Sequence, residues 1–194
     1  MRRHDVKRPI KVSSKKNREE WDKIAEGIFS LIKKQIFHYD LGFPLKNVKK
    51  DYSELSNFLI KAQKRRNGKI RQKIKKATES LVLNAINFHL NFFHPSLLGL
   101  HEEKALKTFK EEMKTIFIRK NADYGDAFRF WGIPGVVVRI GDKYFRLLRL
   151  SQRGYKRKIE DEKIPDTALD LANYGIMLLM LLEEGYPLKW NRMI

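Results

Sequence analysis

Three short stretches in the C-terminal half of the chain combine carboxylates and cations at spacings that suit phosphate or metal chemistry. They are residues 120–126 (KNADYGD), 139–143 (RIGDK) and 161–174 (DEKIPDTALDLANY). Asp170 is the most informative residue, because it lies in a run of Leu, Ala, Tyr, Ile and Met that should be packed on most sides. An unpaired carboxylate would be very costly there. Asp170 therefore needs a partner, either a cation or a metal ion.

The spacing of these acidic residues suits one face of a helix. Asp166, Asp170 and Asn173 stand at i, i+4 and i+7, with Glu162 one turn earlier. A structural interpretation competes with the functional one. Asp166 would then be a carboxylate favoured by the dipole at a helix N-terminus, and Asp170 would pair with an arginine. The spacing alone leaves both interpretations open.

The residues in and near the other two stretches also have structural interpretations that compete with a functional one. Arg139, Lys143 and Arg146 lie on a charged helical stripe, which is also what a solvated face looks like. Asp123 and Asp126 flank Gly125, and Asp and Gly are ordinary turn formers.

The elements that must position these residues are helices. Apolar residues recur at three- and four-residue steps, and no segment shows sustained two-residue alternation. The sequence therefore predicts an all-α bundle of about six helices, with residues 121–134 irregular because of their glycines and proline. The expected helices cover residues 18–39, 48–66, 69–93, 102–119, 136–151 and 165–184. We expect the last two to be antiparallel, so that the Arg139/Arg146 face meets the Asp166/Asp170 face.

Charge divides the chain into three expected parts. Residues 1–16 are a basic tail with too few apolar residues to order themselves. Residues 17–100 form a basic helical region, and residues 101–194 form the domain that carries the three stretches. The formal net charge is +18, and residues 1–100 hold 23 Lys/Arg against 9 Asp/Glu. Such an excess predicts attraction to polyanions.

The basic residues at the end of the second predicted helix and the start of the third are candidates for nucleic-acid contacts. We expect nine of them to be exposed and to bind nucleic acid without sequence preference, with a steep salt dependence. They are Lys61, Lys64, Arg65, Arg66, Lys69, Arg71, Lys73, Lys75 and Lys76.

The amino-acid composition limits which metal ions the protein can bind and indicates its cellular compartment. The chain has no cysteine, so metal ligands must be oxygen or imidazole, which favours Mg²⁺ or Mn²⁺. The basic N-terminus lacks the apolar run of a secretory signal, and the longest apolar block is too short to span a membrane. We expect a cytoplasmic protein, of a cell or of an infected host, with no membrane partner.

Taken together, the three stretches resemble the nucleotide modification associated domain 1 family over roughly residues 105–183. That family occurs in bacteria and their phages and is linked by genomic company to modified nucleotides. Its carboxylate pattern is similar to that of the MazG-type all-α nucleoside triphosphate pyrophosphohydrolases, which hold magnesium between carboxylates on two helices. This chain departs from their spacing, since Glu111 and Glu112 are adjacent and Glu162, Asp166 and Asp170 are four residues apart.

The resemblance implies roles for particular residues. The metal ligands would be Glu162, Asp166, Asp170, Asp123 and Asp126. The catalytic residues would be Asp123, Asp126, Lys143 and Asp170. The substrate-binding residues would be Lys120, Tyr124, Arg139, Lys143, Arg146 and Asn173. Helical pyrophosphohydrolases generally assemble as oligomers, so a homo-oligomer is expected.

The leading hypothesis is a magnesium-dependent enzyme that hydrolyses a free (deoxy)nucleoside triphosphate in connection with nucleotide or DNA modification. Magnesium and cationic side chains would stabilise the charge of the phosphoryl group under attack. The alternative is a non-enzymatic nucleic-acid-binding accessory or regulatory protein that uses the basic N-terminal half through Lys64, Arg65, Arg66, Lys69, Arg71 and Lys73. A third hypothesis is an interaction module in which the C-terminal charges form only a buried ion-pair network.

Overall fold

The computed structural model is an all-α bundle. It describes residues 14–35, 44–64, 68–93, 102–151 and 164–188, and these contain six helices and no strand. The helices are α1 (Ser14–Gln35), α2 (Pro44–Lys64), α3 (Gly68–Phe93), α4 (Glu102–Tyr124), α5 (Ala127–Leu150) and α6 (Ile164–Glu183). The predicted basic tail falls mostly outside these residues, as do Arg65, Arg66 and Glu162.

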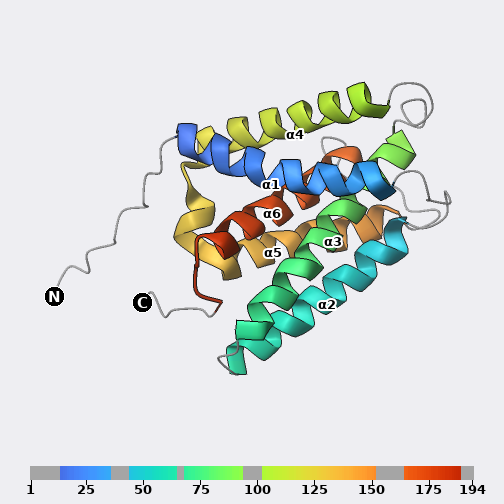
Figure 1. Cartoon of the computed structure of the whole chain (residues 1–194). Helices are drawn as coiled ribbons and strands as arrows, with labels where there is room; N and C mark the ends of the chain where they lie inside the picture. Colours follow the sequence, from blue (N-terminus) through green and yellow to red (C-terminus); the bar gives the residue numbers. More distant parts are fainter. Residues whose placement is uncertain (1–13, 36–43, 65–67, 94–101, 152–163, 189–194) are drawn as a thin grey trace.

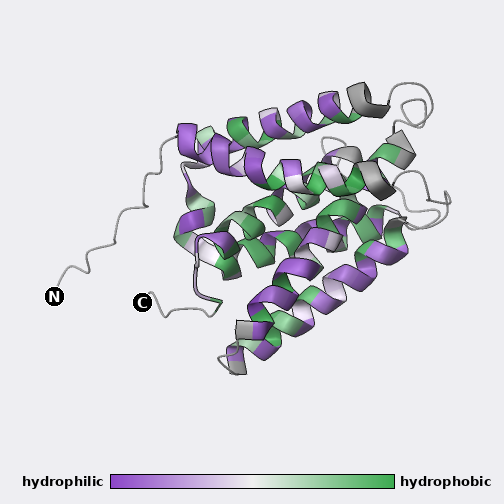
Figure 2. Cartoon of the chain, in the orientation of Figure 1, coloured by the Kyte–Doolittle hydropathy of each residue, from purple (hydrophilic) through white to green (hydrophobic). Residues whose placement is uncertain are grey.

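Helix α6 is the centre of the bundle. Every residue from Thr167 to Leu182 is buried except Tyr174, which is partly exposed. An α-helix that is apolar on all sides needs neighbours on all sides, and α6 packs against α1, α3, α4 and α5. Figure 1 shows α1 and α4 on one side of α6, and the α2–α3 pair on the other. Figure 2 shows that apolar residues gather on the inner faces of these helices.

Close contacts at α6 depend on a small residue. A Cβ atom added at Gly175 would lie 2.3 Å from Cγ2 of Val82 on α3. Glycine therefore sets the distance between the two helices. On the α1 side, Trp21 is fully buried, and its indole N–H donates a hydrogen bond to Oδ1 of Asn173 at 3.2 Å. These contacts join α1 and α3 to the C-terminal helix within one hydrophobic core.

The segment predicted to be irregular, residues 121–134, is largely helical, so that prediction is wrong for most of its length. Helix α4 continues to Tyr124, and α5 begins at Ala127. Phe128 packs edge-on against Phe117 of α4 at 6.4 Å, so tertiary contacts outweigh the weak local propensity. Within α5 the non-helical angles are confined to Gly132, whose φ of 62° and ψ of −160° interrupt the helix before Pro134.

The turn between α4 and α5 is tight and unusual. Gly125 and Asp126 both have left-handed backbone angles, with φ values of 54° and 57°. Left-handed angles cost little for glycine but are uncommon for other residues, Asp and Asn being among the more tolerant. Asp126 is the only described non-glycine residue with a positive φ. Its side chain must therefore make contacts that hold this backbone.

Candidate functional site

The carboxylate of Asp170 is buried at the junction of α4, α5 and α6 and is paired with two lysines. Its Oδ1 accepts a hydrogen bond from Lys120 Nζ, and its Oδ2 lies 3.0 Å from Lys143 Nζ. The side chain of Asp170 is 10% exposed and that of Lys143 is 16% exposed. The expectation that Asp170 has a partner is confirmed. The partners found are lysines, whereas the structural interpretation named an arginine.

The three residues carry two positive charges and one negative charge. The Lys120 side chain remains 46% exposed, so one side of the cluster is open to solvent. An ammonium group has three N–H donors, and Lys120 can therefore donate to Asp170 and to a second oxygen-rich group together. The arrangement suits an anion such as phosphate. We call Lys120, Lys143 and Asp170 the lysine–aspartate cluster.

The antiparallel arrangement predicted for the last two helices is found. Lys143 near the end of α5 meets Asp170 near the start of α6, while Arg129 near the start of α5 meets Glu184 just beyond the end of α6. Arg139 does not join this junction. It lies outward on α5, 65% exposed, with its guanidinium 3.6 Å from the exposed Asp142.

The predicted metal ligands that the structure describes lie on α4, on the turn before α5 and on α6. Asp166 is exposed, one helical turn before Asp170, and Asp123 is exposed near the end of α4. Asp126 is buried, and its Oδ1 accepts hydrogen bonds from Asn17 at 2.5 Å and Asn121 at 3.0 Å. No group of three His, Asp or Glu side chains in the described ranges is placed to hold a metal ion. Both oxygens of Asp170 face ammonium groups.

The remaining predicted substrate-binding residues differ in how accessible their side chains are. Tyr124 is 72% exposed, beside the α4–α5 turn, and is accessible to a ligand. Arg146 is half-buried on α5. Asn173 is buried, and both ends of its amide are engaged, because Oδ1 accepts from Trp21 and Nδ2 donates to the Met113 carbonyl at 3.2 Å.

A second charged cluster, which was not predicted from the sequence, surrounds Arg129 at the start of α5. The Arg129 side chain is 1% exposed, and its guanidinium pairs with Glu20 of α1 and with Glu184. It also donates to Oδ1 of Asn17 at 2.9 Å, and Asn17 in turn donates to Asp126. The cluster thus connects α1 to the left-handed turn before α5. Asn17 and Glu20 lie more than a hundred residues before Arg129, so no local sequence pattern relates them.

Burial and neighbouring charges act in opposite directions within this Arg129 cluster. Burial lowers the pKa of Arg129, but the bonds and charges of Glu184 and then Glu20 outweigh it, and the net shift is upward. Burial also raises the pKa of Glu184; Arg129 opposes the increase and Glu20 adds to it. One cation therefore holds two carboxylates that would otherwise repel each other.

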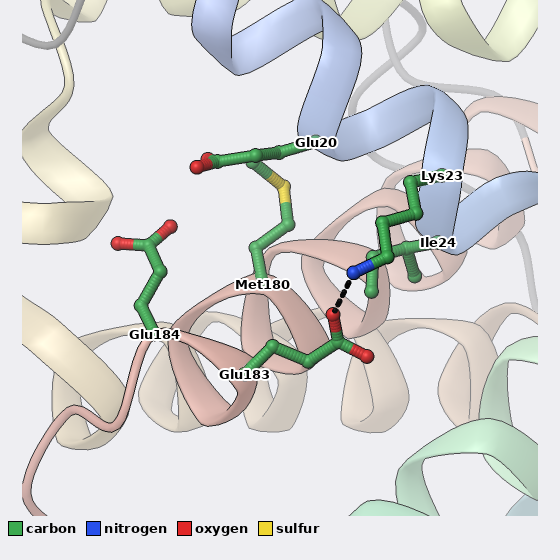
Figure 3. Close-up of a pocket in the computed structure, with 6 residues that line it drawn as sticks. All are labelled: Glu20, Lys23, Ile24, Met180, Glu183 and Glu184. Atoms are coloured by element: carbon green, nitrogen blue, oxygen red, sulfur yellow. Dashed lines mark hydrogen bonds and ion pairs between the residues drawn. The ribbon is translucent and has the colours of Figure 1, made fainter.

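A pocket of about 230 Å³ lies beside the Arg129 cluster, between α1 and the end of α6. Its lining residues are Glu20, Lys23, Ile24, Met180, Glu183 and Glu184. Figure 3 shows Glu20 and Glu184 directed to one side, away from the Lys23–Glu183 pair, whose Nζ–Oε2 distance is 3.3 Å. Met180 follows Asp170 by ten residues, or about 15 Å along a helix. The pocket is therefore separate from the lysine–aspartate cluster.

The candidate nucleic-acid residues are only partly surface residues. Lys61, Lys69, Lys73 and Lys76 are exposed. Arg71 is half-buried, with its guanidinium bonded to the carbonyls of Leu182, at 2.7 Å, and Tyr186. Lys75 is also half-buried, 3.3 Å from Glu183. The expectation that all nine basic residues are exposed is wrong for Arg71 and Lys75. Both side chains are half-buried because they bind residues at the end of α6. The Lys64 side chain lies outside the described residues.

Comparison with known proteins identifies one segment of the chain. Residues 120–182 match the model of the family described as nucleotide modification associated domain 1, which confirms the resemblance predicted from the motifs. This segment contains all three members of the lysine–aspartate cluster and covers about a third of the chain. No match was found among curated proteins or among solved structures. The similarity to MazG-type enzymes stays a prediction. No helix in the described part of the chain is both long and apolar enough to cross a membrane.

Proposed function

We propose that the protein is a nucleotide-processing enzyme that hydrolyses a (deoxy)nucleoside triphosphate as its magnesium complex. The phosphates would lie at the lysine–aspartate cluster. The observation that carries the proposal is the burial of Asp170 between Lys120 and Lys143, inside the segment that matches a nucleotide modification associated family. A purely structural helix gains little from a carboxylate placed among buried leucines.

In this proposal Asp170 fixes the two ammonium groups before the substrate arrives. The positive charge left on the cluster attracts the triphosphate, and Lys120 donates from its exposed side to a phosphate oxygen. Magnesium enters with the nucleotide as part of the substrate, and its usual ligands in such complexes are phosphate oxygens, water and one or two carboxylates. Asp166, which is exposed one helical turn before Asp170, supplies such a carboxylate. The exposed ring of Tyr124 supplies a surface on which a base can stack. We place this activity in the cytoplasm.

The test is turnover of a panel of nucleoside and deoxynucleoside triphosphates with and without magnesium, with phosphate and pyrophosphate release both measured. Asp170→Asn keeps the shape of the side chain and removes its charge. We expect wild-type turnover that requires magnesium and a loss of at least a hundredfold in the variant. Failure of the wild type to release either product from any of the nucleotides would refute the enzymatic proposal.

The chain offers a matched control for the same substitution. Asp22 of α1 pairs with Lys114 of α4 at 2.7 Å, outside the family segment, so Asp22→Asn removes a lysine–aspartate pair elsewhere. We expect this variant to retain full turnover. Melting temperatures of both variants separate loss of chemistry from loss of fold. Equal losses of activity in the two variants would mean that the Asp170 pair is structural only.

A further inference from the structure

The hairpin formed by α2 and α3 contains the most one-sided charge in the chain. From residue 55 to residue 78 there is no Asp or Glu, while nine residues are Lys or Arg. This run covers the second half of α2 and the first half of α3. Figure 1 shows that the end of the hairpin lies at one extremity of the molecule. A helix pair of this charge is not explained by packing alone.

Two cations of this run bind the end of α6, and several others have exposed side chains. Arg71 and Lys75 bind the end of α6, as described above. Lys69, Lys73 and Lys76 are exposed at i, i+4 and i+7, so they lie along one face of α3. From Lys69 to Lys76 the helix rises about 10 Å.

Lys61 of α2 joins the same face across the hairpin. Its Nζ lies 6.0 Å from the centre of the Phe58 ring, and the Nζ of Lys73 lies 5.7 Å from the same ring. The two ammonium groups therefore both lie close to one aromatic ring. We call Lys61, Lys69, Lys73 and Lys76 the lysine face.

We propose that the lysine face binds the phosphate backbone of nucleic acid without reading its sequence. One strand of a duplex presents a phosphate about every 3.4 Å along its axis, so about 10 Å of helix α3 spans about three phosphates. The lysines can follow a strand without inserting a side chain between bases. The surface lies outside the family segment and is distinct from the lysine–aspartate cluster.

An anionic membrane is a less suitable partner for this surface. Helices that lie on membranes insert a broad apolar face below their lysines. Among the described residues of the hairpin, Ile60 is the only exposed large apolar side chain. The other exposed large apolar residues, such as Leu31 and Trp131, belong to α1, α4 and α5. The face therefore offers charge with little apolar surface.

The proposal can be tested by fluorescence anisotropy with labelled duplex DNA, single-stranded DNA and single-stranded RNA across a series of salt concentrations. The variant K69Q/K73Q/K76Q removes three charges from the lysine face. The control K15Q/K49Q/K107Q removes three charges from exposed lysines of α1, α2 and α4. Circular dichroism and melting curves show that each variant is folded.

We expect the lysine-face variant to lose at least tenfold more affinity than the control. The slope of log K against log salt on duplex DNA should fall in magnitude by about 2 to 3, since each lost phosphate contact contributes about 0.9. Equal loss in the two variants would overturn the proposal, because net charge alone would then explain binding. Wild-type affinity that is unchanged by salt, or binding only to phosphatidylserine vesicles, would overturn it as well.

Discussion

Replacement of Arg129 by methionine should destabilise the fold severely, because it leaves two carboxylates without their shared cation. The Arg129 side chain is 1% exposed, whereas Glu20 and Glu184 are 24% and 22% exposed. Removing one partner of a buried ion pair costs about 3 to 5 kcal/mol. Water reaches both carboxylates here, which places the expected loss near the lower end, at about 3 kcal/mol. For a chain of this length that corresponds to a decrease in melting temperature of about 6 to 12 °C.

The assay is urea unfolding followed by circular dichroism, with thermal unfolding as a second measurement. Arg149→Met is the matched control, because Arg149 is an exposed arginine on the same helix, and a surface change of this kind costs about 0.5 kcal/mol or less. The triple variant E20Q/R129M/E184Q should recover part of the stability, since it removes the uncompensated charges too. If R129M unfolded at the same urea concentration as the Arg149 control, the Arg129 cluster would not stabilise the fold as argued.

Two further changes test the packing and the charges of the α3 interfaces. Gly175→Ala should destabilise the fold by about 1 to 3 kcal/mol, because the added methyl group overpacks α6 against α3. Adding Val82→Ala to this variant should recover part of the lost stability. A double variant that is no more stable in urea unfolding than Gly175→Ala alone would contradict the assigned contact. Asp51 is bonded to Ser80 and Asn84 of α3, and burial is the main cause that raises its pKa above 3.8. The protonated form is therefore favoured in the fold, so the wild type should lose stability relative to Asp51→Asn as pH rises from about 3.8 through the raised pKa. A wild type that gained stability relative to the Asp51→Asn variant over this pH range would contradict the prediction.

The positions of the helices could be predicted well where an apolar stripe repeats without interruption. The stripe of α5, for example, continues through Ile133, Val136, Ile140, Tyr144 and Leu147, all buried. The prediction failed before Val136, because Gly132 and Pro134 have low helix propensity and the tertiary contacts that outweigh it are not visible in the sequence. The same stripe extended back by one turn reaches Arg129. The position of Arg129 on the apolar side of α5 was thus the feature of the sequence that could have indicated the Arg129 cluster.

The candidate site was predictable in part for a similar reason. Asp170 stands in a buried run, so the need for a partner followed from its own neighbours in sequence. The identity of the partners did not, because Lys120 and Lys143 approach it only through the packing of three helices. The roles of Asp126 and Asn173 were equally hidden, since their hydrogen bonds run to Asn17 and Trp21 of α1. Long-range contacts of this kind leave no periodic trace in the sequence.

The central position of α6 has a consequence for how the protein is made. Synthesis releases a chain from its N-terminus, so α1, α3, α4 and α5 all emerge before the helix that fills the space between them. Until α6 appears, the apolar faces of these helices have no common partner and stay open to water or to other chains. The final packed state must therefore form late, after α6 has been synthesised, and the exposed apolar faces are open to chaperones during that interval.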